Sequence, residues 1–184
     1  VNADGQEIRY DASNTYSVSA DDYQVLGHNS PDWTMGFQNT LTYKDFDLSI
    51  YMYMRWGQMI KYSVLTDYDP TGLNNYPTYF NVWSETNPSN DFPAMDASIK
   101  DKLSYYPGFA ALSYVDGSFF KIKNITLGYT MPDKLAKKLG LGKLRVYGTI
   151  TNPFVIAKSH LLKDYDPEMN GGLNYPLTKQ LVFG

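Results

Sequence analysis

The sequence predicts an all-β fold of antiparallel, up-and-down strands, with short turns on one side and long loops on the other. Three observations support this prediction. Apolar and polar residues alternate over long runs, the runs reach about eleven residues, and Gly, Pro, Asn and Asp concentrate between them. Ordinary strands have about five or six residues, whereas strands that cross a membrane at a tilt need about 9–11. The strand length therefore brings a transmembrane β-barrel into consideration.

The composition limits both size and chemistry. The chain has 184 residues, enough for one domain with a sizeable core, and a formal net charge of -3. No long run of Lys or Arg accompanies the strand pattern, so nucleic acid is not expected as a partner. The sequence contains no cysteine, which excludes thiol nucleophiles, disulfides and thiolate metal sites. Aromatic residues reach 16%, which is high for an ordinary soluble domain.

The first element with a clear period is a hairpin over residues 33–57. Residues 1–31 are rich in Asp, Asn, Ser and Gly without a sustained period, and we expect them to form a loop. The hairpin arms, 33–43 and 46–56, each alternate between apolar and polar residues, so each arm has one apolar face. A tight Lys-Asp turn joins the two arms.

The rest of the chain alternates between loops and strands. Residues 58–116 are dense in Pro, Asn, Asp, Tyr and Trp and are expected to form a long loop, which in compact domains is usually functional or disordered. Residues 117–157 read as a strand, a connector over 132–142 and a second strand. A second loop over 158–174 leads to a last, truncated strand over 175–184.

The connector has the pattern of a short helical turn. Pro132 suits the first turn of a helix, Leu135 and Leu139 lie four residues apart on one face, and Gly140 suits its C-terminal end. The lysines of this connector are predicted to be solvated, and the last of them favour the negative end of the helix. A capped surface turn is the expected role.

Alternation alone leaves two directions open for the apolar faces: the core of a soluble β domain, or membrane lipid. Soluble domains usually carry Lys, Glu and Arg on their outer faces, whereas the polar faces here hold mainly Thr, Ser, Gln, Asn, Gly and Tyr. Aromatic residues lie near both ends of the hairpin, as in the interfacial girdles of transmembrane barrels. Short turns on one side and long loops on the other also match the outer-membrane layout. Physical reasoning leaves both architectures open.

Collinear motifs over nearly the whole chain carry a family resemblance. They are 26-LGHNSPDWTMGFQNTLTYKDFDLSIYM-52, 118-SFFKIKNITLGYTMPDKLAKKLGLGKLRVYGTITNPFVI-156, 164-DYDPE-168 and 175-YP-176. Together they resemble the C-terminal barrel region of SusC/RagA-type TonB-dependent outer-membrane transporters. The family continues a few residues past the position of Gly184 and ends in an aromatic residue, so here the sequence departs from the pattern.

The resemblance implies a fold and a function. The strands would belong to the C-terminal part of a barrel of about 22 strands, with long extracellular loops and lipid of the bacterial outer membrane on the apolar face. The implied activity is import of glycan oligomers or peptides, energised by TonB through a plug region that this chain lacks. The implied partner is a SusD-like surface lipoprotein that caps the barrel. We expect the chain to be the C-terminal part of a larger protein, and not an enzyme.

The long loop supplies the candidate substrate-binding residues. We expect it to face outward over the pore, where aromatic rings could stack on sugar rings and carboxylates could accept hydrogen bonds from hydroxyl groups. The alternative is that the aromatic residues pack the loop or contact a lid protein. The candidates are Tyr68, Tyr76, Tyr79, Trp83, Asp67 and Asp69.

One weak metal candidate lies near the start of the chain. Asn2, Asp4 and Asp22 supply the oxygen ligands that Ca²⁺ prefers, and related calcium loops in the family have a fuller version of this pattern. Calcium needs several oxygens at close spacing, and here a long segment separates the two clusters. Asx turns are the alternative role for these residues. No other cofactor is expected.

Catalytic constellations are sparse. His28 and His160 lie far apart, and neither has the neighbours of a triad or a zinc site. Asp166 and Glu168 could form the carboxylate pair of a glycosidase, but they lie in the 164-DYDPE-168 motif, which is not catalytic in the family it resembles. Two other readings stay open: a soluble β-sandwich carbohydrate-binding module and a piece of a glycoside hydrolase.

Overall fold

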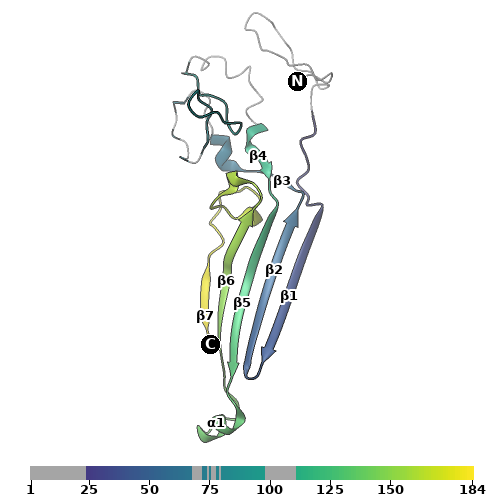
Figure 1. Cartoon of the computed structure of the whole chain (residues 1–184), viewed down its shortest axis with the longest axis vertical. Helices are drawn as coiled ribbons and strands as arrows, with labels where there is room; N and C mark the ends of the chain where they lie inside the picture. The colour runs from purple at the N-terminus through teal and green to yellow at the C-terminus, as the bar shows by residue number, and fades with distance from the viewer. Residues whose placement is uncertain (1–23, 68–71, 74, 76–77, 79, 98–110) are drawn as a thin grey trace, which may run out of the picture.

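The structure, a computed structural model, describes residues 24–67, 72–73, 75, 78, 80–97 and 111–184. Five strands form one antiparallel sheet in the order β1-β2-β5-β6-β7, and a separate sheet pairs β3 with β4 (Figure 1). The strands are β1 (Trp33–Tyr43), β2 (Phe46–Trp56), β3 (Met59–Lys61), β4 (Tyr114–Asp116), β5 (Phe119–Thr130), β6 (Arg145–Ala157) and β7 (Gln180–Phe183). The predicted all-β, up-and-down fold is confirmed.

Helical structure is short throughout the described part of the chain. The connector between β5 and β6 forms the helix α1 (Asp133–Lys138), which projects beyond one end of the sheet (Figure 1). Short 3-10 helices lie at the other end of the sheet, in the loops, among them Ser63–Asp67, His160–Leu162 and Pro167–Met169. None of the described helices is long and apolar enough to cross a membrane.

The two arms of the hairpin, β1 and β2, pair along their whole length. Their register runs without interruption from Trp33 opposite Trp56 to Tyr43 opposite Phe46. Lys44 takes a φ of 53° in the turn between the arms, a left-handed conformation that reverses the chain there. Because the register is regular, the side chains that share a face in the sequence pattern also share a face in the sheet.

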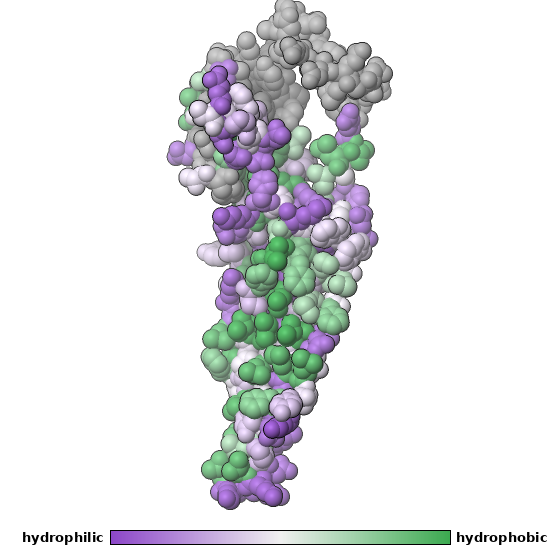
Figure 2. Space-filling view, viewed as in Figure 1, coloured by the Kyte–Doolittle hydropathy of each residue, from purple (hydrophilic) through white to green (hydrophobic). Residues whose placement is uncertain are grey.

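One face of the five-stranded sheet is mainly apolar along its length, with Asn39 of β1 as a polar exception. The strand registers align its side chains into rows, and many of them are exposed: Leu127, for example, keeps 53% of its surface accessible. Figure 2 shows the result as a hydrophobic band over the sheet, between more hydrophilic ends. We call this surface the apolar belt; its large exposed members are Met35, Phe37, Leu41, Tyr43, Phe46, Leu127, Val146, Ile150, Phe154, Ile156, Leu181 and Phe183, with Trp33 and Trp56 at one end.

The height of the apolar belt matches a membrane. β1 has 11 residues, and a rise of about 3.3 Å per residue gives a length of about 36 Å. Tilted by about 45°, as in barrels, such a strand spans about 25 Å. The rings of Trp33 and Trp56 stack at 6.2 Å at one end, and those of Phe46 and Tyr129 lie 4.8 Å apart at the other. Aromatic residues therefore border the belt at both ends.

A β-bulge at Lys123 keeps the apolar side chains before and after it in β5 on the same face of the sheet. Phe120 and Ile122 occupy even positions on the apolar face, whereas Ile125 and the apolar residues after it occupy odd ones. The register with β2 and with β6 shifts at this point, and Lys123 is left without a direct partner. One extra residue flips every later side chain to the other face, so the bulge turns Ile125 back to the side of Ile122.

Buried apolar side chains gather at the loop end of the sheet. The rings of Phe80 and Phe92 stack there at 4.5 Å, and Phe92 is 1% exposed. The cluster joins β3, β4, the segment 80–92 and the loop after β6. We call it the loop core; its buried members are Ile60, Tyr62, Leu65, Phe80, Phe92, Val115 and Leu162.

The structure differs from the sequence prediction in two elements. Residues 58–116, expected to be loop, contain β3, β4 and 3-10 helical turns at 63–67 and 111–113. The last strand, expected over 175–184, covers only Gln180–Phe183, so the prediction of a strand over 175–179 is wrong. Pro176 has no N–H to donate to a ladder, and the carbonyl oxygen of Thr178 accepts a hydrogen bond from the side chain of Asn152 at 3.1 Å.

Candidate functional site

The structure describes two of the six predicted substrate-binding residues. Asp67 ends the 3-10 helix that follows β3, and Trp83 lies in the segment that contributes Phe80 and Phe92 to the loop core. The other four, Tyr68, Asp69, Tyr76 and Tyr79, lie outside the described residues, as do the predicted calcium ligands Asn2, Asp4 and Asp22. Those predictions stay predictions.

Trp83 is presented to the outside by an ordered turn. Its backbone N–H donates to the carbonyl of Phe92, and Val82 forms a bridge with the same residue. The side chain of Asn87 closes the turn by donating to the amide oxygen of Asn81 at 2.8 Å. Trp83 itself keeps 42% of its surface exposed. The segment therefore holds a half-exposed indole ring on a fixed backbone, as a stacking platform requires.

Four charged side chains fix the loop after β6 to the polar face of the sheet. Lys121 of β5 donates to Asp166 at 2.5 Å and to Glu168 at 2.9 Å, and Lys123 donates to Glu168 at 2.5 Å. The side chain of Lys121 is 1% exposed, and those of the two carboxylates are 12% and 16% exposed. We call this group the ionic clamp. It joins residues that are 45 or 47 positions apart in the sequence.

The clamp favours the ionised form of Glu168. Burial alone would raise the pKa of Glu168, but the hydrogen bonds that Lys123 and Lys121 donate outweigh this effect and hold the pKa below its usual range. The buried ammonium group of Lys121 has two carboxylates as partners, which offsets the cost of removing a charge from water. As partners of lysines, Asp166 and Glu168 do not have the free arrangement of the glycosidase pair that the sequence left open.

Local sequence shapes the acidic side of the clamp. Asp166 caps the 3-10 helix Pro167–Met169 by accepting a hydrogen bond from the backbone N–H of Glu168 at 3.1 Å, and Pro suits the first position of that helix. Asn170 follows in a left-handed conformation, with a φ of 54°. Its side-chain oxygen accepts from Arg55 of β2 at 2.9 Å. This short motif therefore contacts two strands of the sheet.

Gly171 brings the same loop against β3 by backbone alone. Its carbonyl accepts from the N–H of Ser63 at 2.9 Å, and its φ is 84°. A Cβ at this position would lie 1.9 Å from the carbonyl oxygen of Lys61, so no side chain fits there. Leu162 anchors the start of the loop in the loop core with 1% exposure. The loop 158–174 is therefore a structural link between the sheet and the outer segments.

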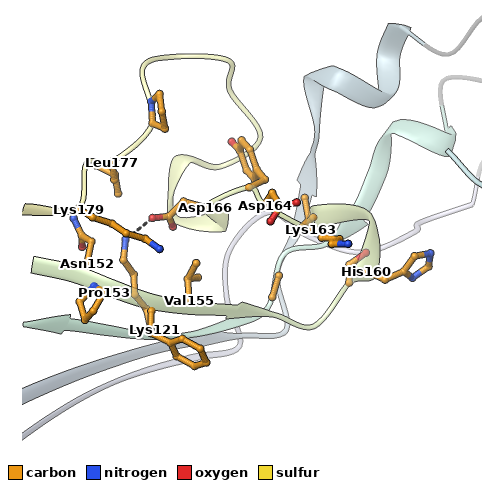
Figure 3. A pocket seen from close by; sticks show the side chains of 16 residues that line it. Lys121, Asn152, Pro153, Val155, His160, Lys163, Asp164, Asp166, Leu177 and Lys179 are labelled. Atoms are coloured by element: carbon orange, nitrogen blue, oxygen red, sulfur yellow. Dashed lines mark hydrogen bonds and ion pairs between the residues drawn. The ribbon is translucent and has the colours of Figure 1, made fainter. Parts of the chain in front are cut away.

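Beside the clamp lies a cavity of about 570 Å³. Figure 3 shows Asn152, Lys163 and Lys179 around this hollow, with Lys121 reaching Asp166 at its wall. A second, shallower hollow of about 670 Å³ lies nearer the middle of the polar face and includes Tyr51, Asn124 and Thr151. Hydroxyl and amide groups on these walls can bond neutral polar ligands such as sugars and peptides.

Both histidines have carboxylate neighbours. The Nε2 atom of His160 lies 2.9 Å from Asp91, which joins the loop after β6 to the segment that carries Trp83. The Nε2 atom of His28 lies 3.3 Å from Asp32. Among the residues described here, no group of three or more His, Cys, Asp or Glu side chains could hold a metal ion.

Sequence reasoning missed the basic half of the clamp. Lys121 and Lys123 are two positions apart in a strand that carries no other charge, and Asp166 and Glu168 are two positions apart in a loop. Two charged pairs with the same spacing suggest a match across the sheet, and this signal could have identified the contact. The bulge that sets the orientation of Lys123 gives no local sign beyond the change from even to odd apolar positions.

Comparison with curated proteins finds TonB-dependent receptors. The chain is 31% identical over 169 residues to TonB-dependent receptor P3 of Formosa agariphila, covering 90% of this chain and 16% of that protein. It is 26% identical over 182 residues to TonB-dependent receptor SusC of Bacteroides thetaiotaomicron, covering 95% of this chain and 17% of that protein. A scan against models of protein families finds no match.

Solved structures agree with the curated relatives. The RagAB peptide importer in its closed-closed state superposes with a TM-score of 0.68 and 27% identity, covering 100% of this chain and 20% of that chain. A structure of the RagAB peptide transporter gives 0.67 and 28%, with 91% and 18% covered. The chain belongs to the SusC/RagA-type family of TonB-dependent transporters.

Family membership explains why the five-stranded sheet is open. In the SusC/RagA-type barrel, the open five-stranded sheet is a section of the wall, so its free edges adjoin further strands. The chain spans about one sixth of the length of the curated relatives that it matches. The clamp, the cavity beside it and the polar hollow lie on the face opposite the apolar belt.

Proposed function

We propose that this chain forms part of the barrel wall and the substrate-side loops of an outer-membrane transporter that imports nutrients too large for passive porins. The two-faced sheet is the observation that carries the proposal. Its apolar belt is about 25 Å tall, the height of the outward-facing apolar band of transmembrane barrels. Its opposite face is polar, and each charged residue of the strands there has a partner: Asp47 pairs with Arg145, Arg55 bonds Asn170, and Lys121 and Lys123 belong to the clamp.

The transported substrate is a glycan oligomer or a peptide, and a SusD-like surface lipoprotein covers the loop end. TonB supplies energy through a plug region in another part of the protein. Two features support a role in substrate binding. At the loop end, Trp83 is half-exposed on its ordered turn. Nearer the middle of the polar face, the walls of the hollow carry hydroxyl and amide groups beside the charged side chains. Asp67, at the end of its 3-10 helix, lies in the same outer region.

Uptake by the full-length protein tests the proposal. Cells that express it should accumulate a labelled oligosaccharide or peptide only when TonB is present, and the protein should fractionate with the outer membrane. Trp83→Ala should weaken substrate binding, whereas Tyr175→Ala, which removes another exposed aromatic ring, should leave binding unchanged. A full-length protein that lacks a plug domain and fractionates in water would contradict the proposal.

The apolar belt opposes the soluble β-sandwich reading. In a sandwich, a second sheet covers the apolar face of the first. In the described part of this chain the second sheet, β3 with β4, packs its buried side chains into the loop core, and the belt stays exposed. The ion pairs of Asp166 and Glu168 likewise give no support to a hydrolase, and the transporter reading accounts for both observations.

A further inference from the structure

The connector between β5 and β6 exposes an unusual combination of side chains. Leu135, Leu139 and Leu141 keep 50%, 63% and 41% of their surfaces exposed. The same segment carries four exposed lysines, Lys134, Lys137, Lys138 and Lys143, against one acidic residue, Asp133. None of these three leucines belongs to the loop core or packs against it, so burial in the loop core does not explain them.

The lysines of the connector are available for an external partner. None of the four forms an ion pair with a described residue, whereas Lys121, Lys123, Arg145 and Lys158 do. The connector concentrates positive charge in a chain whose net charge is -3. A cationic surface of this kind is complementary to anionic groups.

The helix arranges the two kinds of side chain side by side. Lys134 and Lys138 lie four residues apart in α1, and Leu135 lies four residues before Leu139, the residue that caps the helix at its C-terminal end. Each pair therefore occupies one stripe, and the two stripes are adjacent. Ala136 is fully buried on the remaining side. Figure 2 shows hydrophobic and hydrophilic atoms together at the α1 end, on the same side of the molecule as the apolar belt. Adjacent apolar and cationic stripes are typical of helices that lie in a membrane interface.

The position of the connector fits the headgroup layer. The last aromatic row of the apolar belt contains Phe46 and Tyr129, and the connector starts three residues after Tyr129, at Pro132. Three residues correspond to about 10 Å along the strand, or about 7 Å along the membrane normal at a tilt of about 45°. The headgroup layer on each side of the hydrocarbon core is about 5–8 Å thick. α1 therefore continues the lipid-facing belt into the headgroups.

We propose that the connector 132–143 binds the phosphate groups of anionic phospholipids with its lysines while its leucines enter the edge of the acyl layer. The inference rests on the proposed function, because it requires the belt to face lipid. Charge complementarity and continuity with the belt identify the occupant as a lipid surface and not as a protein. The short Lys44 turn at the same end lacks the exposed leucines, so the connector is the anchoring element on this side of the described sheet.

The test uses the full-length transporter, purified in detergent and mixed with equal amounts of phosphatidylglycerol and phosphatidylcholine. Native mass spectrometry should find phosphatidylglycerol retained over phosphatidylcholine. The double variant K137Q/K138Q should reduce that preference by about 25-fold, because each lysine near an anionic surface contributes about fivefold. The matched control K61Q/K163Q removes two exposed lysines at the opposite end and should leave the preference intact.

A second variant separates the effect of the lysine charges from the effect of leucine insertion into the acyl layer. Leu139→Gln should lower the retention of both lipids while the ratio between them stays as in the wild type. Equal retention of the two lipids by the wild type, or an equal loss in the control, would overturn the inference, as would a connector that cross-links a periplasmic protein without any lipid preference. Recovery of the full-length protein in water without detergent would instead overturn the proposed function.

Discussion

The sheet and the loop core bury their side chains in opposite ways. In the loop core, Phe92 and Leu162 are each 1% exposed, as in the interior of a soluble protein. In the sheet, residues of equal hydrophobicity such as Leu127 and Phe154 are about half exposed. The loop core therefore supplies its own apolar environment, whereas the sheet requires one from outside. One chain thus contains two regions built for different solvents, and the ionic clamp joins them.

The clamp gives the largest expected effect. Lys121→Met should destabilise the contact between the loop 158–174 and the sheet by about 3–5 kcal/mol, because it leaves the largely buried carboxylate of Asp166 without its ion-pair partner and Glu168 with Lys123 alone. Hydrogen exchange in the full-length protein should show the loss of protection confined to this loop. Lys123→Met is the matched control and should cost less, since Glu168 keeps its bond to Lys121.

A pair of leucines tests the comparison directly. Leu162→Ala should cost about 2–5 kcal/mol through lost burial and a residual cavity in the loop core. Leu127→Ala removes the same atoms from the apolar belt, where lipid fills the space, and should cost far less. Equal losses of unfolding free energy, measured by denaturation in lipid vesicles, would contradict the separation into two solvents.

A charged substitution distinguishes the two faces of the sheet. Ile150→Arg near the middle of the belt should destabilise the folded barrel by about 2–4 kcal/mol, the cost of a cation on the lipid face at the bilayer midplane. Thr151→Arg places the same charge on the polar face of the same strand and should be tolerated. Folding yield in vesicles, read by the gel shift of heated and unheated samples, provides the measurement.

Acidification should weaken the clamp before it affects the belt. Because its folded pKa is lowered, Glu168 contributes stability that is present above its unfolded pKa, about 4.3, and is lost as the pH falls through the folded value. Protection of the loop 158–174 should therefore decrease below about pH 4.3. In Glu168→Gln the decrease should be smaller, and a loop insensitive to acid in the wild type would contradict the role of the ion pairs.

The smallest effect is expected at Gly128. Arg145 of β6 reaches across this glycine to Asp47 of β2, and a Cβ would lie 2.4 Å from the guanidinium. Both charged groups are at the ends of flexible, exposed side chains, so Gly128→Ala should displace the pair with little loss of stability. The difference from wild type should vanish at high salt, and a large, salt-independent loss would show that the strand packing depends on this glycine.

The sequence predicted the sheet well because period-two alternation is a local property. The bounds of β1 and β2 are those expected from the pattern, and the strands around α1 agree within a few residues. β3 and β4 have three residues each and no alternation long enough to detect. They form because the chain returns to close the loop core, which is a tertiary effect.

The site was less accessible to sequence reasoning. Trp83 was predicted to bind substrate, and the structure shows its ring half-exposed on an ordered turn, while the binding role stays a prediction. The clamp depends on a contact between residues 45 positions apart, for which the matching spacing of the two charged pairs is the signal that the sequence offers. Asp166 and Glu168 attracted attention as a carboxylate pair, but only their distances to Lys121 and Lys123 showed the role of that pair.

The bulge at Lys123 also determines how the strand can be threaded during assembly. A uniformly alternating strand can slide by two residues and still present the correct faces. β5 cannot, because its one interruption must meet the irregularity of β6 at Asn152 and Pro153. A shift of β5 by two residues would also move Lys121 and Lys123 along the sheet and out of reach of Asp166 and Glu168. The bulge thus interrupts an otherwise regular alternation and fixes a single register of β5 against its neighbours. In that register the loop 158–174 can pack against the sheet.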